Sequence, residues 1–217
     1  MKTLITAASV LVLLLGPAQA AHSAQGAAPA AVSLQGMPSG PYTLDPSHAS
    51  LNWKVSHFGL SHYTARFTRF DVNLNFDAQN PQNSTLEVSI DPTSIQTNYP
   101  WPQKEDFDAT LANDAQWFNA SQYPAITFRA TGLTRTGPNT GTMTGDMTML
   151  GQTHPVRMDV TLNGAYVKHP MAGDPALGFS AHGVLKRTDW GLAAYVPFVG
   201  DAVEFFVESE FHKKPEQ

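Results

Sequence analysis

A strict alternation of apolar and polar residues over positions 141–162 constrains the fold more than any other feature of this 217-residue chain. Successive side chains of a β-strand point to opposite faces of a sheet, so a period of two predicts strands with one apolar face. Gly151 separates the pattern into two arms, which predicts a β-hairpin. The apolar positions of this hairpin are Met143, Gly145, Met147, Met149, Val156, Met158, Val160 and Leu162.

The apolar face of the hairpin is rich in methionine. This side chain is unbranched and polarisable, and it adapts to irregular surroundings instead of imposing one shape. Two interpretations follow from the hairpin alone. Either the face belongs to an ordinary sandwich or barrel core in which methionine fills gaps, or it forms the wall of a cavity for a long, flexible apolar ligand.

The same alternation recurs along the chain and predicts an all-β domain of about eight antiparallel strands. Such a domain forms a sandwich or an up-and-down barrel, and closure into a barrel removes exposed sheet edges. An eight-stranded barrel is wide enough inside for one slender ligand. The predicted strands cover residues 51–57, 65–76, 86–90, 126–128, 143–149, 156–162, 179–185 and 203–207.

A different pattern over residues 103–119 predicts one or two short helices near one end of the sheet. Phe107 and Leu111 are spaced as on one face of a helix, and Trp117 and Phe118 follow in a second segment. We expect these segments to lie across an opening or an edge of the sheet. Their aromatic side chains either form a portal for a ligand or cap a barrel end and bury themselves.

The N-terminus has the pattern of a secretory signal peptide. An apolar run over residues 4–15 is too short to be a membrane-spanning helix, and a small-x-small motif follows, with cleavage after Ala20 or Ala24. The predicted organisation is a signal peptide at 1–20, a flexible leader at 21–40, one domain at 41–212 and a tail at 213–217. The signal peptide predicts a periplasmic or secreted protein, and since the chain has no cysteine, we expect it to contain no disulfides.

Composition and motifs argue against several classes of protein. The net charge of −5 is the opposite of the basic surface that nucleic acid requires. We find no Gly-x-Ser-x-Gly elbow and no phosphate-binding loop, and the histidines are scattered without a His-Glu-x-x-His pair. We therefore expect no catalytic residues, no cofactor and no metal site, although metal ligands on distant loops would escape this search.

Four motifs together make the chain resemble the YceI-like family of exported lipid-binding proteins. The first is the aromatic-x-Val-x-His-x-Gly pattern that begins at Trp53, and the others lie at 91–98, at 117–128, and at 145–153 combined with 186–191. In order and spacing they span most of the mature domain. The resemblance implies an extended, lipocalin-like, antiparallel eight-stranded barrel that holds an isoprenoid chain, such as a polyprenyl or quinone tail, in its lumen.

Inward-facing positions of such a barrel are the candidate ligand contacts. His57 has the inward phase and is either a ligand contact or a hydrogen-bonded core histidine. Arg187 and Asp189 either contact a polar head group or form a structural ion pair or turn. The apolar candidates are Trp53, Val55, Phe70, Leu74, Val88, Phe128, Met143, Met147, Met149, Met158, Val160, Phe179, Val203 and Phe205.

Three functions are compatible with these sequence patterns. The first is an exported carrier of a long isoprenoid or similar lipid, which the apolar strands and the resemblance favour. The second is a binding module for a smaller or more polar ligand in a lumen partly filled by aromatic side chains. The third, an enzyme that modifies a lipid, has the least support. The partner of a carrier is a small apolar lipid, and the pattern fits a monomer as well as a homodimer.

Overall fold

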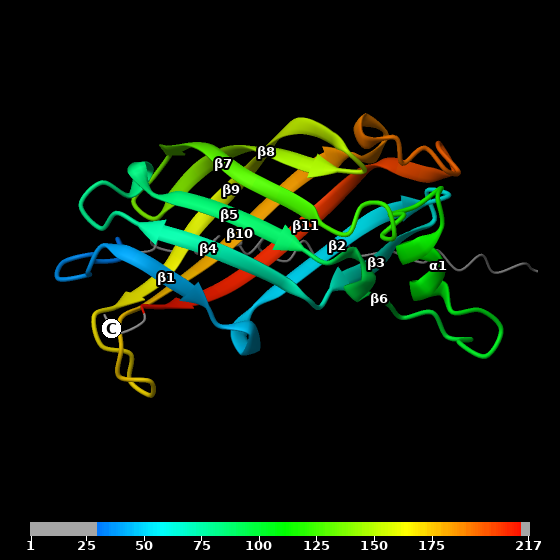
Figure 1. Ribbon diagram of the computed structural model, residues 1–217. Coiled ribbons are helices and arrows are strands. Elements are labelled where there is room, and N and C mark those ends of the chain that lie inside the picture. The colour runs from blue at the N-terminus through cyan, green and yellow to red at the C-terminus, as the bar shows by residue number, and fades with distance from the viewer. Residues whose placement is uncertain (1–29, 214–217) are drawn as a thin grey trace, which may run out of the picture.

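Eleven strand segments join into one antiparallel sheet in the computed structural model, which describes residues 30–213 (Figure 1). They are β1 (Gly40–Leu44), β2 (Ser50–His57), β3 (Ser61–Phe67), β4 (Phe70–Phe76), β5 (Thr85–Ile90), β6 (Ile95–Thr97), β7 (Ile126–Arg135), β8 (Thr140–Met149), β9 (Gln152–Tyr166), β10 (Ala176–Lys186) and β11 (Val199–His212). Their order in the sheet is β1-β4-β5-β7-β8-β9-β10-β11-β2-β3-β6. An additional pairing of β1 with β11 closes the sheet into a barrel.

Three of the barrel strands are each made of two segments. The long strand β11 pairs with β2 through Phe205 and Trp53, and further along the same edge with β1 through His212 and Thr43. On the other side of this composite strand, β3 pairs with β2 and β4 pairs with β1. Next to them, β6 pairs with β3 and β5 pairs with β4. The composite strands are β1 with β2, β3 with β4, and β5 with β6. Together with β7 to β11 they make eight strands, so the predicted eight-stranded antiparallel barrel is confirmed.

Two Asp-Pro sequences produce two of the three breaks, those between β1 and β2 and between β5 and β6. Asp45 precedes the 3-10 turn η1 (Pro46–His48), and Asp91 precedes η3 (Pro92–Ser94). Each aspartate accepts a hydrogen bond from the backbone N–H two residues later, with an N–O distance of 2.8 Å in both turns. Proline cannot donate to the sheet ladder and suits the first position of a turn. The chain therefore leaves the ladder for one turn and rejoins it.

The methionine-rich hairpin forms as the alternation predicts. β8 and β9 are joined by Leu150 and Gly151, whose φ angles of 51° and 74° are those of a tight two-residue hairpin turn. Met143 pairs with Met158 across the ladder, and Gly145 with Val156. The intervening polar residues of β8, such as Thr144 and Asp146, are exposed on the outer face.

One helix, α1 (Phe107–Asn113), lies at one end of the barrel (Figure 1). It starts later than the sequence pattern suggests because Asp106 caps it, accepting a hydrogen bond from the Ala109 N–H at 3.0 Å. The Asp108 carboxylate accepts hydrogen bonds from the backbone and hydroxyl of Thr97, which attaches α1 to β6. Residues 114–119 form turns instead of a second helix. Short 3-10 turns also occur at η2 (Pro81–Asn83) and η4 (Arg187–Trp190).

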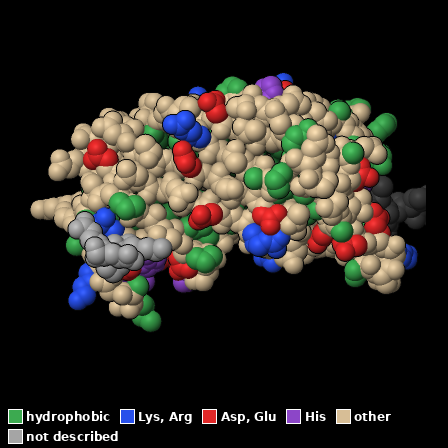
Figure 2. Space-filling model, viewed as in Figure 1, with side chains coloured by type: hydrophobic (Ala, Val, Ile, Leu, Met, Phe, Trp, Pro, Cys, Tyr) green, Lys and Arg blue, Asp and Glu red, His purple; other side chains and the backbone are tan. Residues whose placement is uncertain are grey.

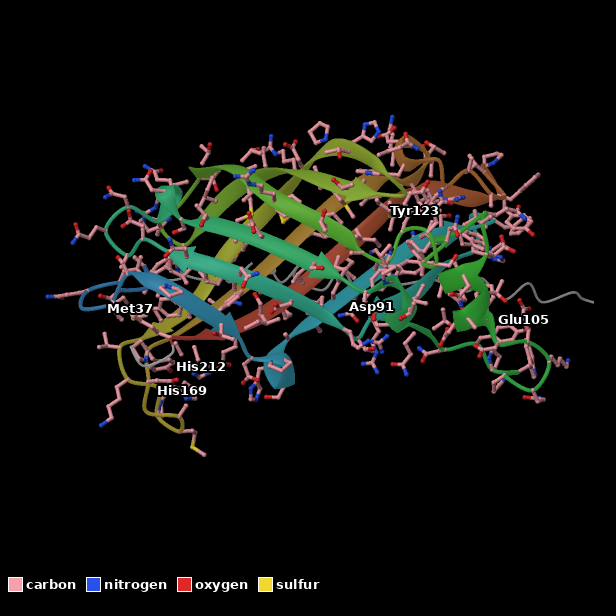
Figure 3. The ribbon with its side chains drawn as sticks, viewed as in Figure 1. Met37, Asp91, Glu105, Tyr123, His169 and His212 are labelled. Atoms are coloured by element: carbon pink, nitrogen blue, oxygen red, sulfur yellow. The ribbon has the colours of Figure 1, made fainter. Side chains whose placement is uncertain are left out.

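The described part of the expected flexible leader packs on the barrel instead. The Val32 N–H donates to the Asn139 side chain at 2.7 Å, and the Asn139 amide donates back to the Ala30 carbonyl. Met37 is 7% exposed and belongs to the apolar cluster around Tyr42. Figure 3 shows Met37 and Glu105 at opposite ends of the barrel. The expected signal peptide, its cleavage site and the tail beyond Lys213 lie outside the described residues.

Candidate functional site

A cavity of about 990 Å³ runs inside the barrel. Alternate side chains of the barrel strands form its wall, and most of them are apolar. The wall contains all of the apolar ligand contacts predicted from the sequence: Trp53, Val55, Phe70, Leu74, Val88, Phe128, Met143, Met147, Met149, Met158, Val160, Phe179, Val203 and Phe205. Contact of these side chains with a ligand stays a prediction.

Two inward-facing glycines make room for aromatic rings on this wall. A β-carbon at Gly145 would lie 2.3 Å from Cζ of Phe128, and one at Gly183 would lie 2.3 Å from Cζ of Phe205. Both phenylalanines line the cavity. The glycines therefore allow each ring to lie flat over a neighbouring strand, where a larger residue would clash with it.

The segment around α1 completes the wall at one end. Phe107, Leu111, Trp117 and Phe118 all line the cavity, and the Phe118 ring meets Phe67 edge to face at a centroid distance of 5.4 Å. These side chains therefore cap the barrel end and line the lumen, and their role as a portal for a ligand stays a prediction.

An apolar rim surrounds an opening of the cavity at the α1 end, and we define it as Phe58, Leu60, Tyr195 and Phe198. Phe58 and Tyr195 line the cavity although they are 57% and 67% exposed, which shows that the cavity reaches the surface here. The Phe58 and Phe198 rings stack at 5.3 Å. Hydrophobic side chains are visible on the surface at this end in Figure 2.

A second, polar opening lies between the start of β5 and β7. These strands pair only from Glu87 to Ile90, so the ladder is open beyond that stretch. The exposed polar residues Gln82, Asn83, Thr85 and Thr131 line the cavity there. The two openings of the lumen thus differ in character, one aromatic and one rich in amides and hydroxyls.

Arg187 lines the cavity, but its guanidinium hydrogen-bonds to the backbone of a loop. It is 5% exposed and donates hydrogen bonds to the carbonyls of Leu192, Ala194, Val199 and Gly200. Burial lowers the pKa of its guanidinium, and the nearby Asp201 carboxylate partly offsets this shift. Of the two interpretations of Arg187, the geometry matches a structural turn.

Asp189 does not lie where the sequence pattern placed it, whereas His57 lies on the cavity wall as one of its two interpretations required. Asp189 is exposed and is not among the lining residues, because it points outward from η4; within the described chain it forms no ion pair with Arg187. His57 does line the cavity, but it is exposed at the end of β2 beside Phe58, with ring centroids 4.8 Å apart. It is therefore a residue of the opening and not a core histidine.

Comparison with known proteins gives this barrel a family. A model of the YceI-like domain matches residues 42–211. The chain belongs to the YceI-like family. It is 34% identical to a UPF0312 protein of Pseudomonas putida over 67% of this chain and 71% of the relative. The resemblance noted from the sequence motifs is therefore confirmed.

Solved structures share the YceI-like fold. The Campylobacter jejuni YCEI protein superposes with a TM-score of 0.63 and 24% identity, over 74% of this chain and 90% of that one. A polyisoprenoid binding domain from Saccharophagus degradans, implicated in plant cell wall breakdown, has a TM-score of 0.59 and 13% identity, over 80% and 98% of the two chains. No helix among residues 30–213 is long and apolar enough to cross a membrane.

Sequence reasoning missed part of the lining of this YceI-like barrel. Leu86 and Ile90 flank Val88 with the same phase, so the alternation itself could have identified them. Tyr63 was missed because the segment 59–62 looked like a break, whereas β3 begins at Ser61. The rim residues Phe58 and Tyr195 lie in turns, with φ of 52° and 61°, and no periodicity marks them.

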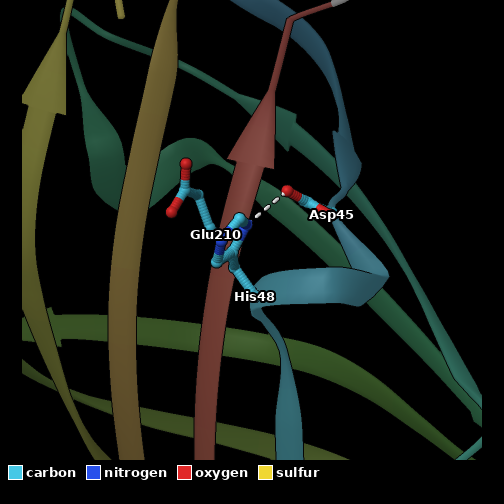
Figure 4. A group of neighbouring side chains, drawn as sticks. All are labelled: Asp45, His48 and Glu210. Carbon is cyan, nitrogen blue, oxygen red and sulfur yellow. Dashed lines mark hydrogen bonds and ion pairs between the residues drawn. The ribbon is translucent and has the colours of Figure 1, made fainter. Parts of the chain in front are cut away.

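Outside the lumen, the YceI-like barrel carries a cluster of histidines and carboxylates (Figure 4). One ligand atom each from Asp45, His48 and Glu210 lie within 4.8 Å of one another, and such atoms suit a transition metal. His48 Nδ1–H donates a hydrogen bond to the Asp45 carboxylate at 2.7 Å, and this hydrogen bond raises the pKa of His48. Among the described residues, these three side chains have the spacing of metal ligands. Glu210 is far in sequence from Asp45 and His48.

His212 extends this cluster at the end of β11, near His169 (Figure 3). Its two ring nitrogens lie 2.8 Å from an Asp174 oxygen and 3.0 Å from a Glu210 oxygen. Burial alone would lower the pKa of His212, but these two hydrogen bonds raise it overall. The polar atoms of the cluster are thus largely occupied by one another, as ion pairs on the barrel surface.

Proposed function

We propose that this protein is a carrier that binds a long isoprenoid or similar lipid inside its barrel. The observation that carries the proposal is a cavity of about 990 Å³ with a wall of apolar strand residues. Pockets for small molecules measure about 300–1,000 Å³, so this cavity is at the upper end of the range. The likeness in fold to a polyisoprenoid binding domain supports the same ligand class.

Burial of the ligand supplies the binding free energy. Each CH₂ group removed from water contributes about 0.8 kcal/mol, and an isoprenoid chain presents many such groups. Met143, Met147, Met149 and Met158 provide an adaptable surface on one side of the lumen. The protein needs no charged side chain to bind such a ligand. The guanidinium of Arg187, which lines the described cavity wall, already donates its hydrogen bonds to loop carbonyls.

We propose binding without catalysis. The Glu105 carboxylate, which lines the cavity, accepts a hydrogen bond from the Thr110 hydroxyl at 3.1 Å. His57 also lines the cavity, and within the described chain no hydrogen bond joins it to Glu105. A paired acid and base is therefore not assembled on the wall in the way that proton transfer would require.

We further propose that the carrier works outside the cytoplasm, in the periplasm or as a secreted protein. The apolar run at residues 4–15 and the small-x-small motif that ends at Ala20 support export. The mass of the mature chain purified from its host tests this part directly, because cleavage after Ala20 or Ala24 fixes that mass.

Native mass spectrometry of the mature protein from its own host tests the carrier function. A bound mass that fits repeated five-carbon units would support it and define the chain length. A protein that stays at apo mass after incubation with polyprenyl lipids would overturn it. A small polar ligand would instead favour the alternative binding module, for which the polar opening at Gln82 and Asn83 is the supporting observation.

A matched pair of variants on β10 sharpens this experiment. Ala181 lines the cavity, whereas Val184 on the same strand is 50% exposed on the outer face. We expect Ala181→Phe to reduce the amount or length of bound lipid by filling the lumen. Val184→Phe adds the same group outside the barrel and should leave lipid binding unchanged.

A further inference from the structure

The apolar rim is built from two chain segments that meet at the α1 end of the barrel (Figure 1). Phe58 and Leu60 lie in the turn between β2 and β3, whereas Tyr195 and Phe198 lie in the loop between η4 and β11. The Phe58 N–H donates to the Phe198 carbonyl at 2.6 Å, and the two rings stack. This backbone hydrogen bond fixes the two segments against each other while their large apolar side chains stay exposed.

Two of the rim side chains are held in an unfavourable backbone conformation. Phe58 and Tyr195 have φ angles of 52° and 61°, in the left-handed region that bulky residues rarely adopt. Gly59 follows with φ of 67°, and turns with two positive φ angles prefer Asn or Asp at the first of these positions. Exposed aromatic rings kept at such a conformational cost indicate a contact with something outside the chain.

The two rim segments also lack charge. Residues 58–61 and 191–200 contain no Asp, Glu, Lys or Arg. The β9–β10 loop at the opposite end exposes Met171 as well, but it contains Lys168 and Asp174 (Figure 1). Surfaces that bind other proteins have a polar, hydrogen-bonding border, whereas the hydrocarbon region of a bilayer accepts apolar side chains and excludes charged ones. The composition of the rim therefore matches a bilayer.

The cavity opens within this rim, because Phe58 and Tyr195 line it. A long lipid chain is strongly disfavoured in water, so its reservoir is a bilayer. A rim in contact with that bilayer joins the hydrocarbon region directly to the apolar lumen. A chain can then pass between them without exposure to water.

We propose that the apolar rim docks this protein on a lipid bilayer, with Leu60 and Phe198 inserted among the acyl chains. The purpose of the docking, uptake or release of cargo, rests on the proposed carrier function. The docking itself needs only the two uncharged segments and their exposed side chains.

The charges of the chain indicate which bilayer it binds. The net charge is −5, and Lys104 near α1 is followed directly by Glu105 and Asp106, so this segment has no basic cluster to attract anionic lipid. We therefore expect binding to vesicles of neutral phosphatidylcholine that persists in about 1 M NaCl, since apolar insertion is not screened by salt. Binding that requires anionic lipid and is lost in salt would overturn insertion of the rim.

A fluorophore at the rim measures insertion directly. The chain has no cysteine, so Leu60→Cys provides a single labelling site for the environment-sensitive dye NBD. Its emission should rise several-fold with phosphatidylcholine vesicles, and acyl-chain nitroxide lipids should quench it. Met171→Cys is the matched control, because Leu60 and Met171 are 87% and 91% exposed. The same response at both positions would overturn the proposal.

Vesicle flotation measures the contribution of the rim to binding. Leu60→Asp should lower the vesicle-bound fraction at least tenfold, because an apolar group is lost and a charge must enter hydrocarbon. Met171→Asp adds the same charge at the other end and should bind like the unmodified protein. Both variants should keep the urea midpoint, since both positions are exposed. Equal binding by the two variants would exclude the rim as the docking surface.

Phe58→Asn separates docking from a role in packing. Asparagine adopts positive φ more readily than phenylalanine, so the urea midpoint should stay the same or rise. Vesicle binding should nevertheless fall several-fold, because an exposed aromatic ring is lost. A marked fall in the urea midpoint with vesicle binding unchanged would show that Phe58 serves the fold and would overturn its role in docking.

A second copy of the chain is the rival occupant of the rim. In that case NBD emission at position 60 would rise with protein concentration without vesicles, and Leu60→Asp would convert a dimer into a monomer in gel filtration. That result would overturn bilayer docking in favour of a dimer interface.

Docking and cargo binding can fail independently. Ala181→Phe fills the lumen and should still bind vesicles. Unmodified protein that carries a lipid in native mass spectrometry but does not bind vesicles would overturn docking and leave the carrier function standing. Protein that binds vesicles through Leu60 but stays at apo mass would overturn the carrier function and leave docking standing.

Discussion

At the scale of single residues, glycine decides how closely an aromatic ring can approach the barrel wall. Gly183 faces Phe205 directly in the β10–β11 ladder, and a β-carbon there would also lie 2.9 Å from the Arg157 carbonyl oxygen. We expect Gly183→Ala to lower the free energy of unfolding by about 1–3 kcal/mol, because the ring and strand must shift. Urea denaturation measures this change.

Gly178 on the same strand provides the control. A β-carbon at Gly178 would meet only Cβ of Asn163, at 3.9 Å, which is ordinary contact. Gly178→Ala should therefore be neutral or slightly stabilising, since alanine loses less backbone entropy than glycine on folding. Equal destabilisation by both substitutions would show that the Phe205 contact is not the cause.

Arg187 illustrates a second effect at this scale, since one planar side chain organises a loop. We expect Arg187→Lys to destabilise the fold by about 2–4 kcal/mol, because a single ammonium cannot reach the four carbonyls that the guanidinium satisfies. The exposed Arg129, whose nearest Glu87 oxygen is 3.6 Å away, is the matched control. Arg129→Lys should change stability by less than about 0.5 kcal/mol. Similar urea midpoints for the two variants would contradict this role.

At the scale of elements, the Asp-Pro turns hold the two halves of a broken strand in register. The Asp91 carboxylate accepts hydrogen bonds from the Thr93 hydroxyl and from Arg69, at 2.6 Å and 2.8 Å, and so connects η3 to the break between β3 and β4. The Thr93 hydroxyl, followed by Arg69, lowers the pKa of Asp91 below its usual value of 3.8.

This lowered pKa predicts how stability depends on pH. Because the folded-state pKa is below the unfolded value, the stabilisation is present above pH 3.8 and is lost as the pH falls through the folded value. Asp91→Asn should thus destabilise the protein at pH 7, and the difference from the unmodified protein should shrink at about pH 3. Urea titrations at both values test this, with Asp146→Asn on the exposed face of β8 as the control. A difference that stays constant with pH would exclude the carboxylate as its source.

At the scale of the whole molecule, the barrel has two unlike openings. The apolar rim projects Leu60 and Phe198 into solvent, 87% and 60% exposed, whereas amide and hydroxyl groups surround the other opening. Exposed apolar groups of this extent commonly mark a route for ligands or a contact surface. We therefore expect a lipid to enter the lumen past the apolar rim.

This asymmetry predicts a kinetic effect of rim substitutions. The double variant Leu60→Ser with Phe198→Ser should slow lipid transfer from vesicles into the barrel several-fold, with little change in equilibrium affinity, since neither residue lines the cavity. Met171→Ser is the control, because Met171 is 91% exposed in the β9–β10 loop. Stopped-flow transfer of a fluorescent polyprenyl lipid measures the rate. Equal rates for all three proteins would contradict this route.

Much of this barrel is already encoded in local sequence patterns. A period of two orients side chains within a single strand, so the apolar face of the 141–162 hairpin and the apolar residues predicted for the lumen wall could be identified without knowledge of the neighbouring strands. The turns at Asp45 and Asp91 were equally accessible, because the conformation of proline and the capping by aspartate involve only adjacent residues.

Other features depend on how distant segments meet, and the tertiary structure alone decides them. Closure of the barrel needs the pairing of Thr43 with His212, which no local pattern encodes. Long-range packing also buries Met37 of the expected leader and brings His48 close to Glu210. It also buries the Trp53 indole N–H and the Tyr63 hydroxyl without hydrogen-bond partners in the described chain. Local sequence determined which face of each strand is apolar, because side-chain direction alternates within one strand. Pairing between distant strands determined which polar groups are buried inside the barrel.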